Sequence, residues 1–327
     1  MKTAMKAVVC TGYGPPEVLQ MQDVEKPTPA SNEVLVKVHA TTVSMGDHRI
    51  RSFTVPSAAW LPARMALGIR RPRRNILGIE LAGEVEAVGE SVRRFQKGDP
   101  VFAATLQGFG AYAEYRCIRE DGPVAAKPTN LTYEEAAAVP IGARTALHYL
   151  KKAEVQGGQE VLIYGASGSV GTYAVQLAKH FGARVAAVCS AANVDLTRSL
   201  GADVVIDYTS EDFATRAERY DVVFDTVGKA SFADCIKVLK SGGSYLNCTP
   251  VLPSLPVVRA RLSGAHKLIL GEAPPETPEA LDVIRELLES GKIRVVVDRK
   301  YRLDDIVEAH RYVDRGRKKG NVVISIV

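Results

Sequence analysis

Three glycines recur at every third residue in one stretch of the chain: Gly165, Gly168 and Gly171. Four apolar or aromatic residues, 161–164, precede them like a short buried strand, and the apolar residues after Gly171 fall at helical spacing. Strand, glycine turn and helix form the context in which such glycines bind a dinucleotide. Gly168 leaves room for a pyrophosphate, Gly171 lets the helix pack close to the strand, and the first helical amides form an anion site. This stretch therefore predicts a nucleotide-binding turn.

The predicted cofactor site extends from this turn to the carboxyl ends of later strands, where ligands of parallel sheets bind. Ala166 stands where the pattern G-x-G-x-x-G has its first glycine. The hydroxyls of the two turn serines are possible further donors. The predicted cofactor-binding residues in this part of the chain are Ala166, Ser167, Gly168, Ser169, Val170, Gly171, Ser190, Asn193, Tyr208, Thr226, Val227, Gly228, Cys248 and Thr249.

The end of the second strand predicts a preference for NADPH over NADH. NAD-binding domains usually carry an Asp or Glu there to accept the ribose hydroxyls, whereas this chain has Ser190, followed by Asn193. A carboxylate would repel a 2′-phosphate, but a hydroxyl and an amide can donate to it. Tyr208, at the end of the next strand, can add its phenol. The basic run 315–319 is a second source of positive charge, although a solvated loop explains it equally well.

The elements around this turn predict a two-domain α/β protein. Residues 1–127 contain short strands separated by Gly and Pro, which indicates a partly open β-barrel. Residues 128–271 alternate strands with helices and indicate a doubly wound parallel sheet. Residues 272–327 contain an amphipathic helix, a strand at 293–297, a second helix and a terminal strand, and are expected to complete the first domain.

Composition excludes several classes of protein. The net charge of +5 in 327 residues is mild and gives no indication of nucleic-acid binding. The five cysteines are scattered without C-x-x-C spacing, which argues against a disulfide framework or a zinc ribbon and favours a reducing compartment. Since no run has the character of a signal peptide or a membrane span, we expect a cytoplasmic protein without membrane insertion.

Several motifs together resemble one family. The opening Met5-Lys-Ala-Val-Val, the pattern Gly78-x-Glu80-x-x-Gly83, the Gly98-Asp-x-Val step and the glycine turn occur in the order found in medium-chain dehydrogenases/reductases. The resemblance covers nearly the whole chain, and the zinc-free quinone oxidoreductase branch is the most similar. It implies a GroES-like catalytic domain, a Rossmann domain, NADPH as hydride donor and a homodimer.

Departures from the zinc enzymes of this family predict that no metal is bound. Ser44 and Ile79 stand where those enzymes have a Cys and a His ligand, and the four-cysteine structural zinc lobe is missing. Asp47 and Glu80, which remain, are interpreted as possible pairing partners of Arg49 or Arg51.

Without a metal to polarise an alcohol, the acceptor must already be electrophilic, as quinones and α,β-unsaturated carbonyls are. The candidate catalytic residues are Ser44, Asp47 and Thr145, the hydroxyls serving to stabilise developing negative charge on oxygen. The resemblance also places Thr145 beside the nicotinamide, and the C-terminal residues Lys319 and Asn321 near the cofactor.

The sequence alone leaves two other functions open. One is a non-catalytic NADPH-binding sensor or structural protein, and the other is an alcohol dehydrogenase with unrecognised metal ligands. The segment 51–75, rich in Pro, Arg and large apolar residues, is either a structural cover or a wall of the substrate pocket.

Overall fold

The computed structural model describes residues 4–55, 60–249 and 254–326. Its residues form two compact units, which are described separately. Unit 1 comprises 1–141, 276–290 and 295–327, and unit 2 comprises 142–275 and 291–294. The first boundary falls after Ile141 rather than at the predicted residue 127, because the short helix α3 (Tyr133–Ala137) packs on the strands β3 (Glu33–Val43) and β4 (Glu80–Val88) of unit 1.

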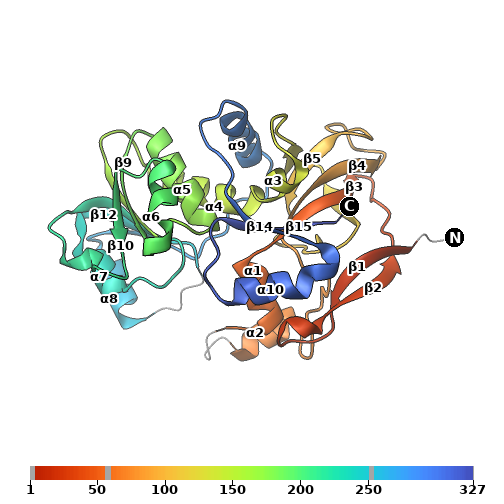
Figure 1. Cartoon of the computed structure of the whole chain (residues 1–327), viewed down its shortest axis with the longest axis horizontal. Helices are drawn as coiled ribbons and strands as arrows, with labels where there is room; N and C mark the ends of the chain where they lie inside the picture. The colour runs from red at the N-terminus through yellow and green to blue at the C-terminus, as the bar shows by residue number, and fades with distance from the viewer. Residues whose placement is uncertain (1–3, 56–59, 250–253, 327) are drawn as a thin grey trace. The chain divides into compact units, whose positions relative to one another are not determined.

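A seven-stranded sheet forms the core of unit 1 (Figure 1). Its strand order is β14-β15-β3-β4-β5-β7, and β6 also pairs with β3. A separate antiparallel pair consists of β1 (Ala4–Cys10) and β2 (Leu19–Glu25). The remaining strands of the sheet are β5 (Pro100–Ala104), β6 (Tyr115–Arg119), β7 (Val124–Ala126), β14 (Val297–Arg302) and β15 (Asn321–Ser325).

The C-terminal segment contributes two strands to this sheet. The last strand, β15, pairs antiparallel with β3, and β14 pairs parallel with β15. Around the sheet lie the helices α1 (Met45–Ser52), α2 (Trp60–Leu67), α9 (Glu279–Glu289) and α10 (Ile306–Asp314), and the short 3-10 helices at Pro16–Val18 and Leu303–Asp305. The predicted strand at 293–297 is wrong: the strand begins at Val297, where pairing with Asn321 starts.

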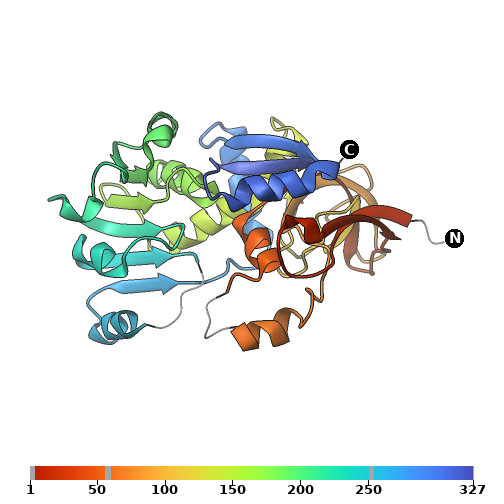
Figure 2. The ribbon, with the colours of Figure 1, turned by 60° about the horizontal axis from the view of Figure 1, so that its bottom comes forward.

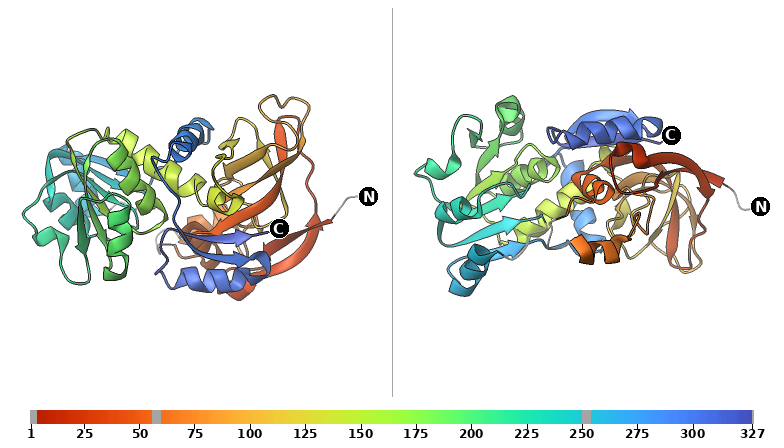
Figure 3. Two further views of the ribbon diagram at one scale, coloured as in Figure 1. Left: turned by 45° about the horizontal axis from the view of Figure 1, so that its top comes forward. Right: turned by 90° about the horizontal axis from the view of Figure 1, so that it is seen from below.

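Unit 2 is a parallel sheet of six strands in the order β10-β9-β8-β11-β12-β13 (Figures 2 and 3). The order reverses at β8 (Glu160–Tyr164), whose neighbours are β9 (Arg184–Cys189) and β11 (Tyr220–Asp225). This is the topological switch point at which doubly wound sheets bind their ligands. The other strands are β10 (Val204–Asp207), β12 (Leu239–Asn247) and β13 (Lys267–Leu270).

Helices connect these strands as in a Rossmann fold, which confirms the predicted fold class. They are α4 (Pro140–Lys152), which begins in unit 1, α5 (Ser169–His180), α6 (Val194–Ser199), α7 (Phe232–Lys237) and α8 (Leu255–Ser263), with 3-10 turns at Ala191–Asn193 and Phe213–Thr215. The central strand β8 is buried at Val161, Leu162 and Ile163, because helices cover both faces of such a sheet. The helix α8 and the strand β13 were not predicted from the sequence.

No helix among the described residues is both long and apolar enough to cross a membrane.

Candidate active site

The turn between β8 and α5 has the geometry that its glycines predict. Gly165 adopts a φ of +80°, and the amides of Gly165 and Ala166 both donate to the carbonyl oxygen of Val188 on β9, at 3.0 and 3.1 Å. A Cβ on Gly171 would lie 2.1 Å from the carbonyl oxygen of Gly165. Only glycine at 171 therefore lets the first turn of α5 pack against the end of β8.

Gly168 serves a different purpose from its two neighbours. It is the N-cap of α5, and it offers no side-chain hydrogen bond to the first helical amides. Its φ is −81°, and a Cβ there would meet only the Gly165 carbonyl oxygen, at an ordinary 3.4 Å. The fold itself thus tolerates a side chain at 168. An uncapped helix N-terminus beside a glycine fits a phosphate-bearing ligand.

Three of the predicted cofactor residues form one polar cluster beside this turn. The Asn193 amide nitrogen donates to Ser167 Oγ at 3.0 Å and to Ser190 Oγ at 3.3 Å. Tyr208 is 54% exposed, and its ring lies 6.4 Å from that of Tyr164 in a stacked arrangement. Hydroxyl and amide groups therefore gather at the end of β9, where the sequence predicts recognition of the 2′-phosphate.

Asp207 at the end of β10 is a carboxylate that the sequence analysis did not consider. The amide and hydroxyl of Thr209 donate to it, and these bonds, with a further one from the Ala191 amide, lower the pKa of Asp207 below its ordinary value. The carboxylate is consequently ionised at neutral pH. It places negative charge next to the loop that follows β9, which opposes a phosphate there.

The ends of β11 and β12 supply the remaining predicted residues of unit 2. Thr226 Oγ1 donates to the carbonyl oxygen of Tyr164 at 2.9 Å, and Cys248 Sγ lies 3.5 Å from the carbonyl oxygen of Thr226. Gly228 has a φ of +69°, and a Cβ there would meet Thr249 Oγ1 at 2.2 Å. These residues lie on the same edge of the sheet as the glycine turn, because β8, β11 and β12 are parallel neighbours.

Two buried residues, both missed by the sequence analysis, hold this edge in place. Asp225 accepts backbone amides from Val227, Gly228 and Ala230 at 2.7 to 3.1 Å, although burial raises the pKa of its carboxyl group. Asn247 Oδ1 accepts the amide and hydroxyl of Thr249. An Asp or Asn as the last residue of a buried strand was the available signal.

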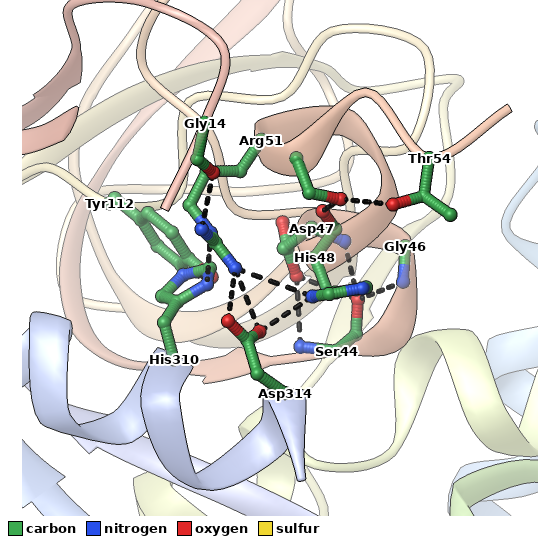
Figure 4. A network of polar contacts seen from close by, with 11 residues as sticks. Gly14, Ser44, Gly46, Asp47, His48, Arg51, Thr54, Tyr112, His310 and Asp314 are labelled. Atoms are coloured by element: carbon green, nitrogen blue, oxygen red, sulfur yellow. Dashed lines mark hydrogen bonds and ion pairs between the residues drawn. The ribbon is translucent and has the colours of Figure 1, made fainter. Parts of the chain in front are cut away.

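The candidate catalytic serine is the N-cap of α1 in unit 1 (Figure 4). Ser44 Oγ accepts the amides of Gly46 and Asp47 at 3.1 and 3.2 Å and donates to Asp47 Oδ2 at 2.6 Å. Asp47 in turn accepts the amides of Ser44 and Gly78, each at 3.0 Å. Burial raises the pKa of Asp47, and its hydrogen bonds oppose that effect. The pair forms a capping box that fixes the direction of the Ser44 hydroxyl.

Glu80 lies buried on β4, and no arginine within the described part of the chain pairs with it. Its Oε1 accepts the Thr42 hydroxyl at 2.5 Å, and its Oε2 accepts the Ile141 amide at 2.8 Å. Burial raises the pKa of Glu80 to about 7. The interpretation of Glu80 as a partner of Arg49 or Arg51 is therefore wrong.

The true partner of Arg51 is Asp314, 263 residues later in the chain (Figure 4). The guanidinium is fully buried and donates to both carboxylate oxygens at 2.6 to 2.7 Å, to the Gly14 carbonyl oxygen, and to His310 Nδ1 at 3.3 Å. His310 Nε2 meets the Tyr112 hydroxyl at 3.2 Å. Burial, followed by the charge of Arg51, lowers the pKa of His310 to about 3, so this histidine is neutral. The network fastens α1 to α10.

The last predicted residues divide between the two units. Thr145 lies half-buried on α4 in unit 2. Lys319 and Asn321 belong to unit 1, where the Lys319 amide donates to Asp298 Oδ2 at 3.0 Å and the buried Asn321 side chain donates to the Val296 carbonyl oxygen. Their roles in catalysis and cofactor binding stay predictions.

Comparison with known proteins gives two family models and many relatives. The models are the alcohol dehydrogenase GroES-like domain over residues 30–129 and the zinc-binding dehydrogenase over residues 200–324. The chain is 35% identical to 2-methylene-furan-3-one reductase of Solanum lycopersicum, over 98% of its own length and 79% of that protein. It is 32% identical to a quinone oxidoreductase of Pseudomonas aeruginosa, over 98% and 99%.

The chain belongs to the medium-chain dehydrogenase/reductase superfamily. Its relatives place it in the quinone oxidoreductase-like branch. A solved quinone oxidoreductase structure from Coxiella burnetii superposes with a TM-score of 0.89 at 29% identity, covering 99% of this chain and all of that one. A further relative, 31% identical, is an NADPH-dependent alkenal/one oxidoreductase of Arabidopsis thaliana, matched over 98% of this chain and 79% of that protein.

The catalytic zinc of some members of this superfamily does not fit the residues present here. Ser44 is engaged as a helix cap, and Ile79 is buried with no atom that could ligate a metal. Within residues 4–55, 60–249 and 254–326, no group of three or more His, Cys, Asp or Glu side chains is arranged to hold a metal ion. The matched zinc-binding model covers 200–324 and includes neither position.

Proposed function

We propose that this protein is an NADPH-dependent, metal-independent oxidoreductase that reduces a quinone or an α,β-unsaturated carbonyl compound. The observation that carries the proposal is the β8–α5 turn, where an uncapped helix N-terminus meets Gly168 at the switch point of the sheet. The names of the relatives, a quinone oxidoreductase and an NADPH-dependent alkenal/one oxidoreductase, support the type of acceptor. When bound, NADPH supplies the hydride.

The residues of unit 2 bind and orient the cofactor in this proposal. The amides at the start of α5 hold the pyrophosphate, and the Thr226–Gly228 loop, fixed by Asp225, shapes the neighbouring edge. Ser190 and Asn193 read the 2′-phosphate by donating hydrogen bonds. Because Asp207 brings a negative charge to the adjacent strand end, the preference for NADPH over NADH is modest, about tenfold to a hundredfold.

The residues of unit 1 and α4 act on the acceptor in this proposal. Hydride addition to an enone or quinone leaves negative charge on oxygen, and the hydroxyls of Ser44 and Thr145 are suited to stabilise it. The Ser44 hydroxyl donates its one hydrogen to Asp47 Oδ2 at 2.6 Å, so in this proposal Ser44 stabilises the acceptor oxygen by exchanging that hydrogen bond for one to the acceptor, whereas the Thr145 hydroxyl acts directly. No metal polarises the acceptor, which is why its double bond must already be conjugated to a carbonyl group. Solvent supplies the proton that completes the reduction.

The test is an NADPH-oxidation screen over quinones and enones, run on protein dialysed against a chelator. Turnover of at least one such acceptor, with no turnover of simple ketones, is the expected result. Gly168→Val serves as the control that abolishes turnover without unfolding the chain. Binding of NADPH without turnover of any acceptor would indicate a non-catalytic binding protein. Activity that is lost on chelation and restored by zinc would indicate a metal-dependent dehydrogenase.

The assembly and location are also proposed. We infer a cytoplasmic homodimer, as is common in this family, and sedimentation equilibrium of the purified chain tests the dimer.

A further inference from the structure

The helix α2 and the loop directly after it present an apolar stripe to solvent; the helix ends at Leu67, and Ile69 belongs to the loop. Leu61, Met65 and Ile69 recur at every fourth residue and are 62, 65 and 74% exposed, and Trp60 beside them is 48% exposed. None of the described residues of α2 is fully buried. Figure 1 labels α2, and Figure 2 shows it as the lower of the two orange helices. Single exposed apolar residues are ordinary, but a set of large ones within one short segment marks an interaction surface.

The other side of α2, to which Trp60 also belongs, is held to unit 1 by Arg64, by the T-shaped contact of Trp60 with Phe53 and by the Tyr13 hydroxyl, which donates to the Gly68 carbonyl oxygen. The Arg64 guanidinium lies 4.1 Å from the ring centre of Phe53, 4.3 Å from that of Tyr13 and 5.0 Å from that of Trp60. Its Nη1 also donates to the carbonyl oxygen of Ile69 at 2.6 Å. Cation–π contacts of this kind fix the rotation of the helix about its axis. The apolar stripe consequently faces outward as part of the fold, although its side chains contribute no burial free energy to folding in that position.

Exposed positive charge follows this stripe, while the buried Arg51 of the same region is already paired with Asp314. From residue 49 to residue 79 the sequence contains seven arginines and no Asp or Glu, in a chain whose net charge is only +5. The loop after α2 turns back sharply, with the Arg73 amide donating to the Leu67 carbonyl oxygen at 2.7 Å. This loop carries four exposed arginines, Arg70, Arg71, Arg73 and Arg74. None of them forms an ion pair with a residue that the structure describes.

We propose that residues 60–74, the α2 segment, dock on an anionic phospholipid surface. Helices that lie at a bilayer interface combine large apolar side chains, Trp among them, with adjacent Lys or Arg. Here the apolar stripe enters the boundary between headgroups and acyl chains, and the arginines lie at the lipid phosphates. A nucleic acid would satisfy the arginines but leave Leu61, Met65 and Ile69 in water. The uncompensated charge favours an anionic lipid surface over a second copy of this chain, which would bring its own arginines against them.

This inference does not depend on the proposed enzymatic activity, because lipid binding is measured with neither substrate nor cofactor. Trp60 is the only tryptophan of the chain and lies within the segment, so its fluorescence reports directly on docking. The probes are vesicles of phosphatidylcholine alone and vesicles containing about a third phosphatidylglycerol. We expect a blue shift of Trp60 emission and co-sedimentation with the anionic vesicles only, both weakening as salt is added.

Two sets of substitutions separate the apolar and the electrostatic contributions. The double change Leu61→Glu with Met65→Glu should abolish binding. The triple change of Arg70, Arg71 and Arg73 to Gln should weaken it by roughly fivefold for each arginine, about a hundredfold in all. The matched control is Leu262→Glu on α8, an equally apolar position that is 82% exposed but lies in unit 2. It should bind like the wild type.

Several results would overturn the proposal. They are equal affinity for neutral and anionic vesicles, no binding to either, or full binding by the Leu61/Met65 variant. Trp60 emission already shielded from acrylamide in the protein without vesicles would show that the stripe is covered in the absence of lipid. A dimer that dissociates in the Leu61/Met65 variant without vesicles would show that a second copy covers it.

Discussion

Replacing Gly168 with valine tests the nucleotide site without breaking the fold. The structure leaves room for the new Cβ, which meets only the Gly165 carbonyl oxygen at 3.4 Å, and the backbone at 168 has a negative φ that valine accepts. Valine is a poorer N-cap than glycine, which costs about 1 kcal/mol of a total stability of about 5–15 kcal/mol. The variant should therefore fold.

Its loss of affinity should be large. The isopropyl group occupies the space through which the pyrophosphate approaches the first amides of α5. A hydrogen bond to a charged group contributes about 1.5–3 kcal/mol, so the loss of two such bonds amounts to about 3–6 kcal/mol, or at least a hundredfold in Kd.

Gly171→Ala is the matched comparison and should behave in the opposite way. Its Cβ would lie 2.1 Å from the Gly165 carbonyl oxygen and 2.8 Å from two backbone atoms of Ala166. Backbone atoms cannot move aside as a flexible side chain can, so we expect destabilisation of about 1–3 kcal/mol or more.

The measurements are NADPH titration by fluorescence and urea unfolding of the wild type and both variants. A folded Gly168→Val protein that binds NADPH with unchanged affinity would refute the assignment of the nucleotide site. A Gly171→Ala protein as stable as the wild type would refute the packing argument.

Other predictions concern the cofactor preference, metal content and acid stability. Ser190→Asp should shift the ratio of kcat/KM values from NADPH towards NADH, and Asp207→Asn should shift it towards NADPH; a ratio unmoved by either change would place phosphate recognition elsewhere. Elemental analysis should find no stoichiometric zinc, and about one zinc per chain lost together with activity on chelation would contradict this. The pKa of His310 is about 3 in the folded protein, against an ordinary value of 6.5. Between these pH values the unfolded chain binds a proton that the folded chain does not. The free energy of unfolding therefore falls as the pH drops from 6.5 towards 3. Between pH 7 and pH 5, this fall should be about 2 kcal/mol smaller in His310→Gln than in the wild type. The exposed His180→Gln is the control, and equal pH slopes in His310→Gln and wild type would show that His310 does not drive the acid sensitivity.

The sequence determined those features whose causes are local. The strand, turn and helix around Gly165, Gly168 and Gly171 follow from residue types at fixed spacing, since Gly165 and Gly171 each meet a steric demand within the same turn. The order of strands and helices in residues 160–247 follows likewise from apolar runs separated by turn residues. The capping box at Ser44 and Asp47 is also local, because its two members are three residues apart.

Only the tertiary structure decided features whose partners lie far apart in the chain. Arg51 had several possible carboxylate partners in sequence, and packing of α10 against α1 selected Asp314. The strand predicted at 293–297 begins instead at Val297, because pairing with β15, not local propensity, sets where β14 starts. Asp207 faces the loop after β9 only because β10 is placed beside that strand. In each case the local sequence leaves several choices open, and a contact between residues far apart in the chain selects one of them.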